Sequence, residues 1–305
     1  MGRAADLLRL VRAPLAPTAA LDALACATLA RGPGLSRGAA PLSLADAALL
    51  CATSLLVYAA GMAGNDLADR EIDRTIHPER PLPSGRLPVA WAVALVVLAA
   101  AGALLIGGGP SGSRVAVAVA LGLAFAYDGA LKRSVAGGAL AMGLVRASNA
   151  ACGVLPLWAS GETSAVSLAA PLCIGLYSAG VTVLSTAEGR PALERPRRLV
   201  ARVAAAVAVG AAGVLAGLGA AGLAVGSFLA LGILSSIAFA RVPRPGAVKA
   251  QVFEMLLGLF WLEAILATGA RPGSDALWGL GAVALAFGLS LLAQIWARAL
   301  RRSTP

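Results

Sequence analysis

Ten apolar runs, each close to the length that crosses a bilayer, dominate this chain of 305 residues. A helix needs about 20 predominantly apolar residues to span the hydrocarbon core. Inside lipid the backbone must satisfy its own polar groups, so such runs form helices. The sequence therefore predicts an all-α, polytopic transmembrane bundle that forms a single integral-membrane domain over 1–305. The expected spans lie near 14–30, 44–64, 88–107, 113–127, 135–158, 165–187, 198–219, 222–241, 247–268 and 276–297.

The positive charge is a topology signal. The chain is 59% hydrophobic and only 13% charged, which excludes a soluble domain of this size. If the N-terminus is cytoplasmic, most of the 25 Lys and Arg residues fall in cytoplasmic loops or ends, as the positive-inside rule requires. We therefore expect a multi-pass protein of the bacterial cytoplasmic membrane, with both termini and the active site facing the cytoplasm. We expect these basic residues to interact with membrane lipids and not with nucleic acid.

The segment NDLADREIDRTIHPERPLPSG, residues 65–85, gathers acidic residues after the second span. On a helix, Asp66, Asp69 and Asp73 share one face, because they are spaced i, i+3 and i+7. Hard carboxylate oxygens suit Mg²⁺, so we expect these three residues to be catalytic metal ligands. The alternative is a solvated, charge-mixed loop. The arginines that could hold phosphate oxygens beside such a metal are Arg70, Arg74, Arg80 and Arg86.

Three polar segments are expected at the same side of the membrane. They are the Asp-rich segment, the turn at 127–133 and the stretch 188–202. Spans two and six are thus followed by comparable polar loops, which indicates two related halves. Charge at the mouth of a bundle with apolar walls favours a substrate that carries a diphosphate on a long hydrocarbon tail.

The Asp-rich segment resembles the first signature of the UbiA superfamily of intramembrane prenyltransferases. That signature is N-D-x-x-D-x-x-x-D followed by R-P-L-x-x-G, and the helical hydropathy agrees over about 12–268. Tyr127 with Lys132 and Arg133 is similar to the family's Tyr-then-Lys-Arg turn. Thr18 and Asp22 in the first span are similar to residues of the family's EboC-like branch. Arg146 with Asn149 is similar to a polar pair of the family. The residues that match the first signature are Asn65, Asp66, Asp69, Asp73, Arg80, Pro81, Leu82 and Gly85.

The resemblance implies nine core helices around a central cavity, to which this chain adds a tenth. It also implies Mg²⁺ as cofactor, with transfer of an isoprenyl group from an isoprenyl diphosphate to an aromatic or lipid acceptor in the membrane. The expected diphosphate-binding residues are Asn65, Arg74, Arg80, Tyr127, Lys132, Arg133, Arg146 and Asn149.

The family's second Asp motif is degenerate here. Aligned from Tyr177, its Asp positions fall on Ser178 and Ser185, and only Glu188 keeps a carboxylate. Hydroxyls are weak Mg²⁺ ligands beside carboxylates. Three outcomes stay open: one Mg²⁺ suffices with help from Glu188, Arg and Lys hold the diphosphate, or catalysis is lost.

Two other functions compete with the transferase. The first is a non-catalytic carrier or binding protein for isoprenoid lipids. The second is a phosphatidyltransferase, although that signature needs Asp-Gly and Ala-Arg pairs that are missing upstream of Asp69. Among single residues, Asp128 is expected to pair with Lys132 at i, i+4. Glu254 and Glu263 are nine apart and therefore lie on opposite faces of a helix.

Overall fold

The computed structural model describes residues 2–107, 112–217 and 248–269, together with isolated positions between 281 and 295. The described part is helical, and its one β feature is an isolated bridge between Ser36 and Thr163. The all-α prediction is therefore confirmed. The expected span 222–241 lies outside the described residues, as does most of the expected tenth span.

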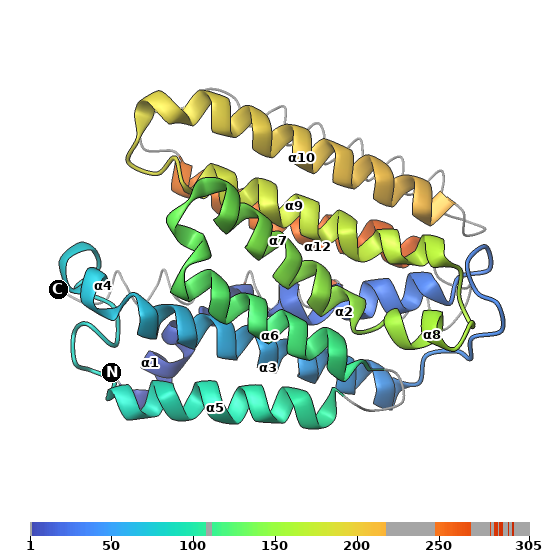
Figure 1. Cartoon of the computed structure of the whole chain (residues 1–305), viewed down its shortest axis with the longest axis horizontal. Helices are drawn as coiled ribbons and strands as arrows, with labels where there is room; N and C mark the ends of the chain where they lie inside the picture. Colours follow the sequence, from blue (N-terminus) through green and yellow to red (C-terminus); the bar gives the residue numbers. More distant parts are fainter. Residues whose placement is uncertain are drawn as a thin grey trace.

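The long helices run side by side along the longest axis of the molecule (Figure 1). Six helical stretches among the described residues are long and apolar enough to cross a membrane. The α-helices are α1 (Arg3–Leu10), α2 (Ala16–Ala30), α3 (Leu44–Ala68), α4 (Arg70–Ile76), α5 (Val89–Ile106), α6 (Arg114–Gly129), α7 (Val135–Ala151), α8 (Leu155–Ala159), α9 (Ala169–Ser185), α10 (Pro191–Gly217) and α12 (Val248–Thr268). The 3₁₀ turns are η1 (Ala13–Leu15), η2 (Leu131–Arg133) and η3 (Ala165–Leu168).

Serine caps mark where several helices begin. The side chains of Ser43, Ser113 and Ser134 accept hydrogen bonds from backbone N–H groups in the first turns of α3, α6 and α7. A capping oxygen of this kind satisfies one of the N–H groups that a helix start leaves without a partner. The polar residue before each of these apolar runs thus sets the helix boundary.

One expected span is interrupted. The sequence predicts a single helix over 135–158, but α7 ends at Ala151 and α8 begins only at Leu155. A turn over 152–154 separates the two helices, and Pro156 sits in the first turn of α8. Because proline has no N–H to donate, it fits the first turn of a new helix better than the interior of a long one.

Glycines allow α7 and α9 to cross closely. A Cβ atom added at Gly175 would lie 2.7 Å from the carbonyl oxygen of Gly143, and the reciprocal contact would be 2.8 Å. Small residues at helix crossings are typical of membrane bundles, in which packing replaces the hydrophobic driving force. The largest buried core lies beside this crossing and joins α2, α7, α9, α10 and α12.

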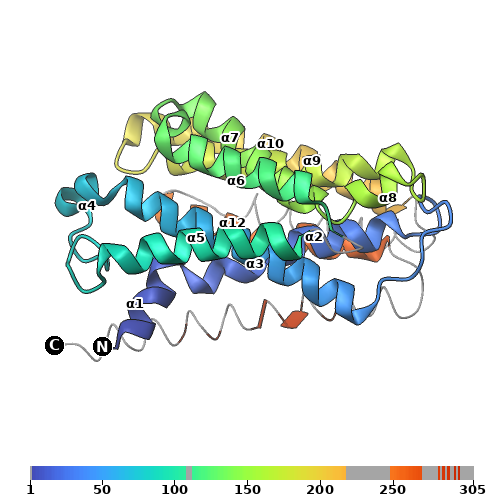
Figure 2. The same cartoon turned by 60° about the horizontal axis from the view of Figure 1, so that its bottom comes forward.

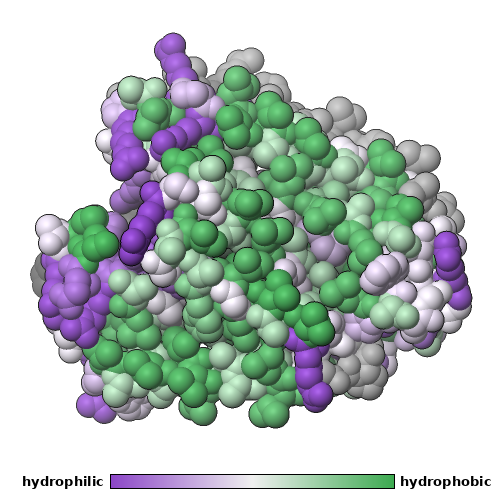
Figure 3. Space-filling view, in the orientation of Figure 1, coloured by the Kyte–Doolittle hydropathy of each residue, from purple (hydrophilic) through white to green (hydrophobic). Residues whose placement is uncertain are grey.

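The polar segments gather at one end of the bundle, as the sequence predicted. Figures 1 and 2 both place α1, α4 and the N-terminus at this end. Ion pairs hold the segments there: Lys132 of η2 pairs with Asp69 of the Asp-rich segment, and Glu188 of the third segment pairs with Lys249 of α12. Hydrophilic side chains also cluster at the left of the space-filling view, whereas apolar side chains cover most of the visible flank (Figure 3).

Candidate active site

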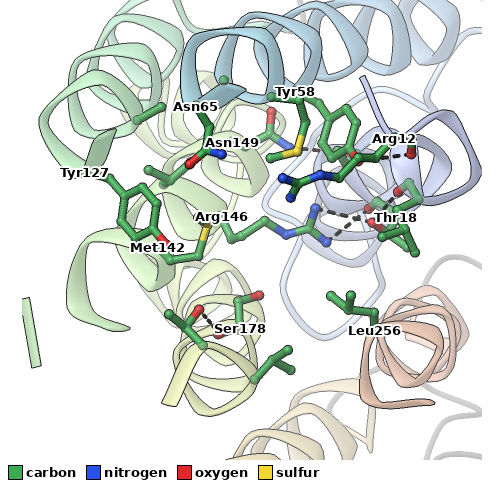
Figure 4. Close-up of a pocket in the computed structure, with 18 of the residues that line it drawn as sticks. Arg12, Thr18, Tyr58, Asn65, Tyr127, Met142, Arg146, Asn149, Ser178 and Leu256 are labelled. Carbon is green, nitrogen blue, oxygen red and sulfur yellow. Dashed lines mark hydrogen bonds between the residues drawn. The ribbon is translucent and has the colours of Figure 1, made fainter. Parts of the chain in front are cut away.

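A cavity of about 260 Å³ opens between helices of both halves of the bundle. Its lining includes Asn65, Tyr127 and Asp128 from the polar end of α3 and α6. Deeper in the bundle, Arg146 and Asn149 of α7 reach its floor (Figure 4). Its apolar walls include Val57, Met62, Met142, Val145, Val181, Val252, Leu256 and Leu259.

Asp66 and Asp73 form one carboxylate pair beside this cavity. Both side chains are buried, and the same guanidinium nitrogen of Arg80 contacts them, at 3.7 Å from Asp66 Oδ1 and 2.6 Å from Asp73 Oδ2. Arg12 adds a contact of 3.4 Å to Asp66 Oδ1. Two cations therefore offset the charge of two carboxylates where the chain leaves α3.

Asp69 and Asp128 form a second carboxylate pair, held by Lys132. The Lys132 Nζ atom lies 2.6 Å from Asp69 Oδ1 and 3.8 Å from Asp128 Oδ1. The same ammonium donates to Asn65 Oδ1 at 3.3 Å. The expected i, i+4 pair of Asp128 and Lys132 is thus present, and it belongs to the Asp-rich site. Four carboxylates and two bridging cations surround the mouth.

The three aspartates of the first motif do not share one helical face. Helix α3 ends at Ala68, Asp69 forms a turn, and α4 begins at Arg70. Asp69 points to Lys132, whereas Asp66 and Asp73 point to Arg80. In the part of the chain that the structure describes, no three His, Cys, Asp or Glu side chains converge on a ready-made metal site. The aspartates meet as two pairs, each drawn together by a cation.

Some predicted phosphate ligands lie elsewhere. Arg74 pairs with Glu71, and its side chain is 54% exposed. Arg133 is exposed and is absent from the cavity lining. Arg86 contacts Asp6 at 3.1 Å and so ties the Asp-rich segment to α1. The structure therefore brings Arg80 and Lys132 to the carboxylates, but not these three arginines.

Arg146 is both a cavity residue and a structural partner. Its Nε and Nη2 atoms each lie 3.1 Å from a carboxylate oxygen of the fully buried Asp22, and its Nη1 atom is 3.4 Å from Thr18 Oγ1. Asn149 donates to the carbonyl of Ala19 at 3.0 Å. The polar pair of α7 is therefore anchored to α2, so that a guanidinium is held in place at the cavity floor.

The second motif offers little to a metal. Ser178 and Ser185 line the cavity, yet their hydroxyls donate to the carbonyls of Ile174 and Thr182 on their own helix, each at 2.8 Å. Tyr177 is fully buried and donates to the carbonyl of Met255 at 2.9 Å, which joins α9 to α12 away from the cavity. These three side chains thus stabilise helices and helix contacts.

Sequence reasoning missed three cavity residues. Arg12 has a φ of 47°, the only positive φ at a described non-glycine residue, and its carbonyl accepts a hydrogen bond from Tyr58 at 3.3 Å. Backbone strain of this kind is often held at functional sites. Ser54 is fully buried against the cavity, and its hydroxyl has no hydrogen-bond partner among the described residues. The available signal was the spacing of Ser54 and Tyr58, which puts two polar groups on one face of an apolar helix.

The fold and the site together define an intramembrane enzyme class. Aspartates, two of them buried, lie with a lysine and an arginine at the polar end of a helical bundle, beside a largely apolar cavity. The sequence model of the UbiA prenyltransferase family matches residues 23–261. The chain belongs to this family, and it is an integral multi-pass membrane protein.

Two curated relatives carry the name digeranylgeranylglyceryl phosphate synthase. The one from Ignicoccus hospitalis is 35% identical over 150 residues, which cover 47% of this chain and 49% of the relative. The one from Methanothrix thermoacetophila is 42% identical over 77 residues, which cover 24% of this chain and 28% of the relative. The matched stretches thus span about half or less of these relatives.

Solved structures share the fold. A structure from work on digeranylgeranylglyceryl phosphate synthase in membranes has a TM-score of 0.62 at 16% identity, covering 92% of this chain and all of the other. A UbiA homologue from Aeropyrum pernix has a TM-score of 0.59 at 21% identity, covering 83% and 96%. A UbiA homologue from Archaeoglobus fulgidus, bound to GPP and Mg²⁺, has a TM-score of 0.55 at 16% identity, covering 86% and 99%.

Proposed function

We propose that this chain is a Mg²⁺-dependent prenyltransferase that moves an isoprenyl group from an isoprenyl diphosphate to a hydrophobic acceptor in the membrane. The observation that carries the proposal is the meeting of Asp66, Asp69 and Asp73 with Arg80 and Lys132 beside an apolar cavity. Membership of the UbiA prenyltransferase family supports it independently.

The donor set fits one magnesium ion. Mg²⁺ usually takes one or two protein carboxylates and completes its shell with water and substrate phosphate, so a pair of aspartates is enough. Asp66 and Asp73, which already meet at Arg80, would supply two ligands, and Asp69 would join them by exchanging Lys132 for the ion. The ion would supply positive charge that stabilises the diphosphate as it leaves.

The protein's own groups act on the same charge. As the bond between the allylic carbon and the diphosphate oxygen breaks, its electron pair stays on the diphosphate. Arg80 and Lys132 stabilise that developing charge. The walls of Val57, Val181 and Leu256 hold the hydrocarbon chain and keep water away from the allylic cation. A nucleophilic atom of the acceptor then bonds to the allylic carbon, and the proton it loses passes to the released diphosphate.

The acceptor class and the orientation are part of this proposal. The names of both curated relatives support a lipid acceptor over an aromatic one. The gathering of basic and acidic side chains at one end of the bundle supports a site that opens to the cytoplasm. The phosphatidyltransferase alternative has no support from the family match.

One observation favours a second candidate, a non-catalytic isoprenoid-lipid carrier. Ser178 and Ser185 replace the carboxylates of the second motif and bond to their own helix. A carrier of this origin would bind isoprenyl diphosphates tightly with Mg²⁺ and release no diphosphate with any acceptor. The turnover assay below separates the two functions.

The test uses the purified chain in lipid nanodiscs with labelled geranyl or geranylgeranyl diphosphate, Mg²⁺ and a panel of lipid acceptors. We expect Mg²⁺-dependent release of diphosphate and a labelled lipid product. Asp66→Ala and Asp69→Ala should each remove turnover. Glu71→Ala is the matched control, because Glu71 lies in the same segment but its side chain is 65% exposed and pairs only with Arg70 and Arg74 among the described residues. Equal loss in all three variants would overturn the site assignment.

A further inference from the structure

A lysine lies beside the degenerate motif, at the polar end of the bundle. Lys249 precedes Val252 and Leu256 by three and seven residues on α12, so it continues the stripe with which these two residues line the cavity. Glu188 follows Ser185 by three residues at the end of α9. The Lys249 Nζ atom lies 2.8 Å from Glu188 Oε1. The pair therefore joins the polar ends of α9 and α12, just beyond the residues of these helices that line the cavity.

This half does not fit a metal ion. Its two cavity serines are hydrogen-bonded within α9. Glu188 is the one carboxylate that the motif itself retains, and Lys249 holds it. A Mg²⁺ ion bound here would gain a single carboxylate and would have to displace an ammonium ion to reach it.

Lys249 carries a charge suited to a diphosphate. The hydrogen bond and the negative charge of Glu188 raise the pKa of Lys249, with a smaller contribution from Glu79, while Arg80 lowers it. Its ammonium is therefore charged at neutral pH. Ammonium groups on flexible stems are common phosphate ligands.

We propose that Lys249 binds the diphosphate of the substrate from the second half, in the place of a second metal ion, so that this chain works with one Mg²⁺. The inference rests on the proposed function. Glu188 holds the ammonium at the polar end of the bundle in the free protein, and the diphosphate, with its higher charge, takes over that contact on binding.

Binding of an unreactive analogue tests this assignment. The probe is geranyl thiolodiphosphate, titrated by calorimetry into the full chain in nanodiscs at saturating Mg²⁺. Lys249→Met should weaken binding about tenfold, because it removes a charge-assisted hydrogen bond from a side chain that is largely exposed. Arg190→Met is the matched control, because it removes an exposed cation from the same end of the bundle. The control should bind as the unchanged chain does.

Glu188→Gln should change the affinity for the analogue in opposite directions, depending on whether Glu188 restrains Lys249 or holds a metal ion. If Glu188 only restrains Lys249, its loss frees the ammonium and binding becomes tighter. If Glu188 instead holds a metal, binding weakens and the metal count falls. The count is measured with Mn²⁺ by electron paramagnetic resonance in the presence of the analogue, and we expect one ion per chain.

Each outcome has a distinct meaning. Two Mn²⁺ ions per unchanged chain, or Lys249→Met binding as tightly as Arg190→Met, would overturn the lysine proposal and leave the prenyltransferase assignment intact. Failure of the unchanged chain to bind the analogue at any metal concentration would remove both. Because Lys249 is 68% exposed, its substitution should leave the melting temperature unchanged, which is checked in parallel.

Discussion

Replacing Lys132 with methionine should change metal binding and turnover in opposite directions. Lys132 Nζ contacts Asp69 and Asp128 at 2.6 and 3.8 Å, and its side chain is only 21% exposed. In the free protein the ammonium occupies the oxygens that a metal ion would use. In the proposed reaction it would contribute positive charge next to the diphosphate. Methionine keeps the length of the side chain and removes the charge.

The size of both effects follows from this geometry. Two unit charges about 4 Å apart interact by about 1 kcal/mol in water and about 4 kcal/mol at an effective dielectric constant near 20. At this partly buried site, removing the repulsion of Lys132 should tighten Mn²⁺ or Mg²⁺ binding by at least about 1–2 kcal/mol, or about tenfold. Losing a charge-assisted hydrogen bond to the diphosphate costs about 1.5–3 kcal/mol, which lowers kcat/KM about 10- to 100-fold.

Metal binding is measured without diphosphate, by Mn²⁺ titration of Lys132→Met in nanodiscs. Turnover is followed as release of diphosphate from geranylgeranyl diphosphate. Lys132→Arg retains the charge, so it should bind metal about as weakly as the unchanged chain. The reasoning would be refuted if Lys132→Met bound the metal more weakly, or if its kcat/KM stayed within about twofold of the unchanged chain.

Three further predictions concern stability and the metal. Gly175→Ala should lower the free energy of unfolding by about 1–3 kcal/mol, because its Cβ would press on the backbone of α7. Gly213→Ala, whose Cβ would meet nothing within 4 Å, should instead raise the free energy of unfolding by up to about 1 kcal/mol. Unfolding in mixed micelles measures both variants, and equal effects would contradict the close crossing of α7 and α9. Asp22→Asn leaves the guanidinium of Arg146 buried without its charged partner and should cost about 3–5 kcal/mol. Arg146→Met in the Asp22→Asn background should recover part of that loss, and strictly additive costs in the same unfolding assay would count against the pair. Chelation of divalent cations by EDTA should abolish turnover and Mg²⁺ should restore it, an expectation that activity surviving dialysis against EDTA would disprove.

Local patterns determined much of this protein. Runs of apolar residues predict helices because lipid leaves the backbone no other partner, and Ser43, Ser113 and Ser134 mark helix starts through contacts three residues away. The Asp-rich motif and the degenerate second motif are readable in the same way. Each of these features depends on residues that are close together in the sequence, so their identity and spacing can be read from it directly. The spacing of Glu254 and Glu263 places them on opposite faces of α12, and in the structure Glu254 is exposed whereas Glu263 is fully buried.

The tertiary structure decided which charges meet. Asp69 pairs with Lys132 across 63 residues, and Arg146 pairs with Asp22 across 124. Spacing within a helix reports which face a side chain takes, but not which other helix lies opposite. That partner depends on close crossings such as Gly143 with Gly175, where packing of whole helices sets the distance. The division of the aspartates into two cation-held pairs, the cavity role of Arg12 and the contact of Lys249 with Glu188 all arise at this level, because each joins segments that only the assembled bundle brings together.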